Sequence, residues 1–312
     1  TELTAVEAAM LAAAPPVGII LFARNVRDRV QLQGLTTALR QATGNPDLLI
    51  LIDQEGGRVM RLRPPQWRAL PSMAAIGALA QGQAALARRA AWLVGRLIGH
   101  DLAEVGIDIA CTPVLDLRQD DTTIAIGDRS FGADPALAAS LGREVLAGLA
   151  DAGRHGVIKH LPGHGRARAD SHLVMPVVEA DVATLAATDF AAFGAMADVP
   201  LGMTAHVLYT ALDAERPATL SPVVIGTVIR GLIGFRGILM SDDLDMGALG
   251  GSKPVRALAT LAAGCDLALV CSGDQAEAQA VLDAVPVVDG ALAARLAGLA
   301  VRQSVPRDID GL

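Results

Sequence analysis

The densest group of chemically versatile side chains lies in residues 159–172, which read KHLPGHGRARADSH. This segment contains a lysine, an aspartate and three of the six histidines of the chain. Pro162, Gly163 and Gly165 break regular structure here, whereas residues 156–158 before the segment are apolar. The pattern predicts a strand that opens into a polar loop. Because buried polar groups need partners and loops on rigid scaffolds often carry function, we expect a functional site here.

Asp170 and His172 have the types and spacing of an acid/base pair. An imidazole with a pKa of about 6.5 can donate and accept a proton near neutral pH, and a nearby carboxylate can orient the ring and stabilise its charged form. An isolated Asp-Ser-His triplet is more typical of a helix cap or a surface histidine. His160 and His164 add the alternative of a metal site, but the intervening Leu-Pro-Gly excludes the helical arrangement of HExxH zinc ligands, and we expect no metal.

Further charged residues stand at the ends of apolar runs. Asp53 follows LLILI and precedes two glycines, so that Asp53 and either Arg58 or Arg61 could face a pocket for sugar hydroxyls or carboxylates. The alternative for these residues is a salt bridge at the rim. Asp242 follows GILMS, where an ionised aspartate could stabilise a cationic transition state or attack it. Arg129, in IGDRSF, fits either a ligand contact or a loop brace.

Short apolar runs alternate with alanine-rich stretches of helical character, which predicts an α/β fold with a parallel sheet. The expected strands are residues 17–22, 48–52, 107–113, 156–160, 201–206, 237–241 and 266–271. The expected helices are residues 4–13, 30–42, 83–105, 135–152, 181–197, 222–233 and 254–263.

The polar candidates follow the carboxyl ends of these strands. Asp53 follows the second strand, Lys159 and His160 the fourth, and Asp242 the sixth. In a parallel barrel these ends share one face, where active sites form, whereas an open doubly wound sheet would gather only the residues near its switch point. We therefore predict a single (β/α)8 TIM-type barrel domain over residues 1–312. Seven strands are one short, and we expect the first strand upstream of the first residue.

Bulk composition excludes several classes of function. The net charge of −7 and the lack of a basic run argue against nucleic acid as a partner. No segment reaches the roughly 18 uninterrupted apolar residues of a membrane helix. Cys111, Cys265 and Cys271 lie in or beside apolar runs without metal-type spacing, as buried free thiols do. We expect a cytoplasmic protein with no membrane partner, and a monomer, since no sequence feature argues for an obligate assembly.

Taken together, these segments resemble glycoside hydrolase family 3, and within it the bacterial β-N-acetylglucosaminidases of the NagZ type. The resemblance covers residues 18–246 and follows the order of the family. The matching segments are GIILFARN, LIDQEGGRV, IGDRSF, KHLPGHG with ADSH, MTAHVLY, PATLSP and SDDLDM.

The resemblance implies a retaining mechanism with a covalent glycosyl-enzyme intermediate. Asp242 would be the nucleophile, His172 the acid/base and Asp170 the residue that holds His172, so the usual two-carboxylate spacing rule does not apply. The resemblance implies no cofactor, and a small-molecule amino-sugar substrate: muropeptide fragments in which N-acetylglucosamine is linked β-1,4 to anhydro-N-acetylmuramic acid, handled in the cytoplasm during peptidoglycan recycling. The residues implied to bind the terminal N-acetylglucosamine are Asp53, Arg61, Arg129, Lys159 and His160.

Three alternatives stay open at this point. A glycoside phosphorylase could use the same site, because a histidine acid/base lacks the negative charge that repels phosphate. A metal-dependent hydrolase and a catalytically silent sugar-binding barrel are the others. The glycine-rich loop over residues 163–169 further suggests that His172 moves into place when substrate binds.

Overall fold

The computed structural model describes residues 1–171, 174–247 and 249–299 of the 312-residue chain. Within this part of the chain, all seven predicted strands are present and parallel. One four-stranded sheet contains β1 (Gly18–Leu21), β2 (Leu49–Ile52), β5 (Ile109–Ala110) and β6 (His155–Gly156) in that order. The other contains β12 (Leu267–Leu269), β11 (Ile238–Asp243), β9 (Leu201–Thr204) and β7 (Ile158–Leu161) in that order. Only Val157 separates β6 from β7, so the two sheets are continuous through one strand.

The third strand is shorter than expected, with β5 ending at Ala110 instead of at residue 113. Pro113 has no amide hydrogen to donate to a ladder. The chain pairs again at Val114, which forms a parallel bridge with Lys159, and the amide of Leu115 donates to the carbonyl of Lys159 over 2.8 Å. This second pairing carries Asp116 to the side of His160.

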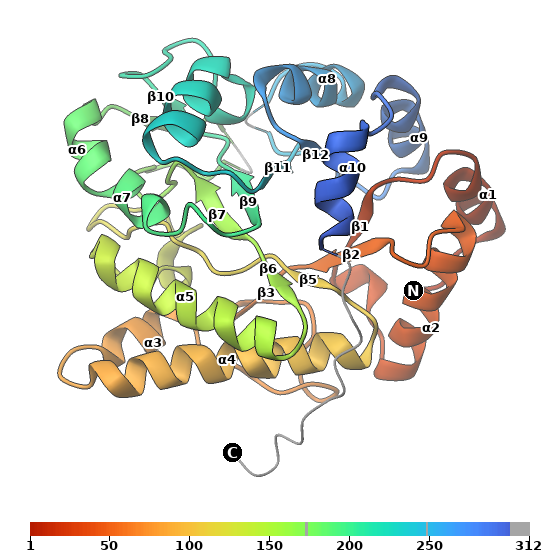
Figure 1. Cartoon of the computed structure of the whole chain (residues 1–312), viewed down its shortest axis with the longest axis horizontal. Coiled ribbons are helices and arrows are strands. Elements are labelled where there is room, and N and C mark those ends of the chain that lie inside the picture. Colours follow the sequence, from red (N-terminus) through yellow and green to blue (C-terminus); the bar gives the residue numbers. More distant parts are fainter. Residues whose placement is uncertain (172–173, 248, 300–312) are drawn as a thin grey trace.

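Alternate side chains of the strands pack on opposite faces of the sheet. Leu49 and Leu51 of β2 belong to a buried cluster that receives side chains from both four-stranded sheets, whereas Ile50 and Ile52 pack toward the helices. A cluster that gathers residues from both sheets requires the strands to curve around it. Leu292 and Leu296 of α10 (Gly290–Ala297) pack against the same cluster. In Figure 1 this helix lies close to β1.

The α/β class is confirmed, but no barrel closes among the described residues. Within these residues, β1 and β12 are the edge strands of the two sheets, and neither has a neighbouring strand on its outer edge. Residues of both strands line an apolar cavity of about 620 Å³. At the carboxyl ends, the Arg24 guanidinium spans the opening and donates to the carbonyl of Cys271 over 2.5 Å.

Helices surround the curved sheet in Figure 1. Besides α10, the helices are α1 (Ala5–Ala13), α2 (Arg29–Thr43), α3 (Met73–Leu79), α4 (Ala84–Glu104), α5 (Pro135–Asp151), α6 (Val182–Ala187), α7 (Asp189–Gly194), the π-helical η4 (Val224–Leu232), α8 (Lys253–Ala263) and α9 (Gln275–Ala284). Thr4 and Glu7 form a capping box at the start of α1. The single helix expected over residues 181–197 divides at Thr188, where Asp189 turns inward to an ion pair with Arg166. None of the helices in the described segments combines the length and apolar composition needed to cross a membrane.

Helices α4 and α5 pack side by side (Figure 1). At their crossing there is no room for a side chain. A methyl group on Gly148 would lie 2.1 Å from the carbonyl oxygen of Trp92, and one on Gly95 would lie 2.1 Å from that of Val145. Both contacts are with backbone, which cannot rotate away. Glycine at these positions therefore sets the distance between the two helices.

We expect Gly148→Ala to destabilise the protein by about 1–3 kcal/mol, because the overpacking cost exceeds the helix propensity that alanine gains, about 1 kcal/mol. Urea unfolding measures this change. Gly34→Ala in α2 is the matched control, since nothing lies within 4 Å of the added methyl group, and it should be neutral or stabilising. Equal stability of the two variants would contradict the packing argument.

Candidate active site

Five charged side chains form a paired network at the carboxyl ends of β2 and β7. Asp53, directly after β2, accepts from Lys159 Nζ over 2.9 Å and from Arg61 Nη2 over 2.9 Å. Glu55, in β3 (Gln54–Gly56), lies 2.7 Å from Lys159 Nζ and accepts two bonds of 2.8 Å from Arg129. Lys159 thus joins the two carboxylates, and four of the predicted sugar-binding residues gather at one location.

The short hairpin of β3 and β4 (Val59–Met60) sets the position of Arg61. Gly56 and Gly57 turn the chain with φ values of 104° and 56°, in the region that favours glycine. The side-chain oxygen of Gln54 then accepts the amides of Arg61 and Leu62 over 2.9 and 3.0 Å. The turn therefore returns Arg61 to Asp53, whereas Arg58 reaches outward to Asp128.

Burial and charge act in opposite directions on this network. Burial alone would raise the pKa of Glu55, but the positive charges of Arg129 and Lys159 hold that pKa well below its usual range. For Lys159 the signs are reversed. Burial alone would lower its pKa, but the negative charges of Asp53 and Glu55 raise it. Glu55 and Lys159 are consequently both charged at neutral pH.

A second buried chain runs from Asp116 through His160 to Asp242. Oδ2 of Asp116 lies 2.6 Å from Nδ1 of His160, and Oδ1 accepts the backbone amides of His160 and His164 over 3.2 and 2.6 Å. On the other side of the ring, Nε2 of His160 lies 3.9 Å from Oδ2 of Asp242. One carboxylate therefore orients the imidazole whose far nitrogen faces the other carboxylate.

The two adjacent aspartates at the end of β11 differ in environment. Burial would raise the pKa of Asp242, but His160, His206 and the amide of Asp243 lower it to about 2, so Asp242 is ionised. Burial raises the pKa of Asp243 to about 6. Its carboxylate accepts the amide of Asp245 over 2.9 Å. The two neighbouring carboxylates therefore have different partners, and Asp242 is the one near His160.

His206 supports the end of β11 beside the carboxylate pair. Its Nε2 bonds the carbonyl of Asp243 over 2.9 Å, and its Nδ1 lies 2.8 Å from the hydroxyl of Thr219. A carbonyl can only accept, so Nε2 carries a proton. His206 is fully buried and fixes the backbone from which Asp242 projects.

Most predicted site residues come together here, and two contributors were missed. Neither Glu55 nor Asp116 was predicted, although Asp116 follows the apolar PVL run much as Asp53 follows its own strand. Asp170 lies in the described part of the chain and is half-buried, whereas His172 lies outside the described residues.

The segment before Asp170 is held by several contacts. Thr122 donates to the carbonyl of Gly165 over 2.5 Å, the amide of Thr123 donates to the carbonyl of Ala167 over 3.0 Å, and Arg166 pairs with Asp189 over 2.7 Å. These bonds fix residues 165–167 and so limit the movement that the glycines suggest for this loop.

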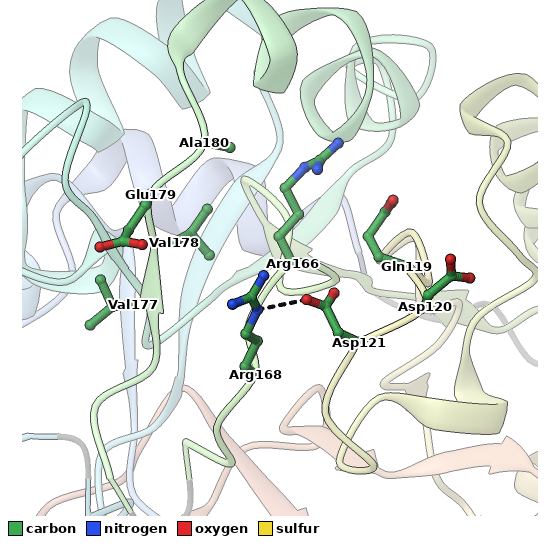
Figure 2. Close-up of a pocket in the computed structure, with 9 residues that line it drawn as sticks. All are labelled: Gln119, Asp120, Asp121, Arg166, Arg168, Val177, Val178, Glu179 and Ala180. Atoms are coloured by element: carbon green, nitrogen blue, oxygen red, sulfur yellow. Dashed lines mark ion pairs between the residues drawn. The ribbon is translucent and has the colours of Figure 1, made fainter.

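A polar pocket of about 490 Å³ borders this segment (Figure 2). Its walls are the loop that follows β5, the chain leading to Asp170, and β8 (Val177–Val178). Figure 2 shows Arg168 reaching Asp121, and the two form an ion pair of 2.6 Å. Side chains of both charge signs line the pocket, namely Asp120, Asp121 and Glu179 against Arg166 and Arg168.

Comparison with known proteins gives one consistent family. The model of the glycosyl hydrolase family 3 N-terminal domain matches residues 2–301. A beta-hexosaminidase of Chromobacterium violaceum is 41% identical over 303 residues, which cover 96% of this chain and 84% of that protein. The crystal structure of NagZ from Neisseria gonorrhoeae in complex with N-trifluoroacetyl-D-glucosamine is 35% identical with a TM-score of 0.88, covering 96% of this chain and 87% of that one. The chain therefore belongs to glycosyl hydrolase family 3 and is a glycoside hydrolase.

Proposed function

We propose that this glycoside hydrolase is a retaining exo-β-N-acetylglucosaminidase that acts through a covalent glycosyl-aspartate intermediate. The observation that carries the proposal is the ionised Asp242 carboxylate at a strand's carboxyl end, 3.9 Å from Nε2 of His160. The neighbouring Asp53–Lys159 pair supplies polar groups suited to sugar hydroxyls. The similarity to beta-hexosaminidases supports the same reaction class.

The chemistry divides into two steps. Asp242 attacks the anomeric carbon while the glycosidic bond breaks, and His172 donates a proton to the departing oxygen. His172 then accepts a proton from water, whose oxygen attacks the anomeric carbon and releases the aspartate. Asp170 orients the imidazole of His172 and stabilises its charged form. Such acid/base assistance contributes about 10²- to 10⁴-fold in rate.

In this proposal the paired network binds the terminal N-acetylglucosamine through its hydroxyls and acetamido group. The side chains of Asp53, Arg61 and Lys159 are 17%, 24% and 3% exposed, and their mutual ion pairs hold them in place before substrate arrives. Prior orientation lowers the entropy cost of binding. Arg129 and His160 complete the set, each held by a buried carboxylate.

The physiological substrate is proposed from the resemblance. We propose muropeptide fragments carrying N-acetylglucosamine β-1,4-linked to anhydro-N-acetylmuramic acid, cleaved in the cytoplasm during peptidoglycan recycling by a monomer without a cofactor. We also propose a single domain, with an eight-stranded barrel in which one more parallel strand lies between β1 and β12. No observation favours the phosphorylase alternative over hydrolysis.

Trapping the intermediate tests the proposal. Incubation with a slow fluorinated β-N-acetylglucosaminide that has a good leaving group should add one sugar mass to the peptide that contains Asp242, because fluorine slows the second step. Peptide mass spectrometry locates the label. A label on any other residue would overturn the nucleophile assignment, and phosphate-dependent release of sugar 1-phosphate would overturn hydrolysis.

A further inference from the structure

His164 is a buried histidine to which the proposed mechanism gives no role. His164 is 2% exposed, and its backbone amide donates to Oδ1 of Asp116 over 2.6 Å. Its ring meets that of His160 edge to face, with centroids 5.9 Å apart and planes at 65°. Asp116 thus fixes both histidines, one through its ring nitrogen and the other through its backbone.

The ring of His164 reaches the segment that carries the proposed acid/base pair. Nε2 of His164 lies 3.1 Å from the hydroxyl oxygen of Ser171, which is buried at 4% exposure. Ser171 stands between Asp170 and His172 in the sequence, and consecutive Cα atoms are about 3.8 Å apart. Anchoring Ser171 therefore fixes the point from which the chain continues to the proposed acid/base residue.

The protonation of His164 is set by its surroundings. Within the described residues its Nδ1 is buried without a hydrogen-bond partner. The bond between Nε2 and the Ser171 hydroxyl is therefore the side-chain contact that satisfies this ring. Burial lowers the pKa of His164 to about 4, although the negative charge of Asp116 acts in the opposite direction. The ring is therefore neutral at neutral pH.

We propose that His164 is a positioning residue that ties Ser171, which precedes the proposed acid/base residue in the sequence, to the fixed Asp116–His160 pair through the hydrogen bond between its Nε2 and the Ser171 hydroxyl. This inference rests on the proposed function, in which His172 protonates the leaving group. The nucleophile is held separately, by β11 and His206. Loss of the His164 bond should therefore weaken proton transfer to the leaving group and leave attack by Asp242 intact.

If His164 supports proton transfer but not nucleophilic attack, the activity lost on its substitution should depend on the leaving group. The specificity constant kcat/KM reports the first step, in which a poor leaving group needs its proton and a 2,4-dinitrophenolate does not. His164→Asn should lower kcat/KM roughly 10²-fold for 4-methoxyphenyl N-acetylglucosaminide, the loss typical of a misplaced catalytic group. For the dinitrophenyl substrate the loss should be less than about threefold.

His164→Gln is the matched control. Glutamine can place an amide N–H near the position of Nε2, whereas asparagine reaches only the position of Nδ1. We expect His164→Gln to retain most activity on both substrates, and Ser171→Ala to reproduce the pattern of His164→Asn. If His164→Asn does not fold, as judged by thermal melting, Ser171→Ala carries the test alone.

Two outcomes would overturn the role of His164: equal losses on both substrates, or equal behaviour of the asparagine and glutamine variants. His172→Ala separates this result from failure of the proposed function. If His172→Ala shows no steeper loss on the methoxyphenyl substrate, the acid/base assignment itself is wrong. If it does show that loss, and His164→Asn does not, only the positioning role of His164 is wrong.

Discussion

Asp242→Asn is expected to lower kcat/KM by about 10⁴-fold or more, even for substrates with activated leaving groups. Asparagine has the shape of aspartate but no charge with which to attack the anomeric carbon. Because the pKa of Asp242 is lowered to about 2, the wild-type carboxylate is ionised throughout any ordinary assay, and its charge is lost only as the pH falls toward that value. Steady-state kinetics on the 2,4-dinitrophenyl substrate measure the effect.

Asp243→Asn is the control for this change. The neighbouring carboxyl group bonds the amide of Asp245 and has a raised pKa of about 6, so the substitution alters a similar side chain outside the proposed reaction path. We expect it to retain activity within roughly tenfold of the wild type. Comparable losses in the two variants, with unchanged melting temperatures, would show that Asp242 is not distinguished as the nucleophile.

The sequence predicts the site where a polar residue directly follows an apolar strand. Asp53, Lys159 and Asp242 were all found this way, since strands of a curved parallel sheet end on a common face. Asp116 was missed because the expected strand ended at residue 113, and the renewed pairing at Val114 depends on a partner strand far along the chain. Periodicity within one segment contains no information about that partner.

Glu55 was missed for a different reason. It stands two residues after Asp53, within the turn that the glycines indicate, and nothing local distinguishes a turn carboxylate at the surface from one that meets Arg129, 74 residues away. The same limitation applies to the helix expected over residues 181–197. It divides at Thr188, next to Asp189, whose pairing with Arg166 is a contact that only the folded chain creates.

Asp53 and Arg61 were given two interpretations, a salt bridge or a sugar-binding pair, and the geometry is compatible with both at once. The 2.9 Å ion pair exists, yet its side chains keep 17% and 24% of their surface exposed at the carboxyl end of the sheet. Such a pair can hold its geometry and still contact a ligand. Glu55 is buried between Arg129 and Lys159 and holds both of them through ion pairs.

Glu55→Gln should therefore destabilise the protein by about 3–5 kcal/mol, the usual cost of removing one partner from a buried ion pair. Glutamine keeps the volume of glutamate, so the loss comes from the positive charges of Arg129 and Lys159, which stay buried with less compensation. Urea unfolding at neutral pH measures the change. Asp198→Asn is the control, because the Arg143–Asp198 pair is exposed and such pairs contribute about 0–1 kcal/mol.

The pH dependence gives this prediction a second check. The folded-state pKa of Glu55 is depressed, so its contribution to the free energy of unfolding is complete above the ordinary glutamate pKa of about 4.3 and declines as the pH falls toward the folded value. The difference in stability between the wild type and Glu55→Gln should be constant near neutral pH and narrow below about pH 4.3. A difference that is small at neutral pH, or that widens in acid, would mean that Glu55 does not hold Arg129 and Lys159 as a charged group.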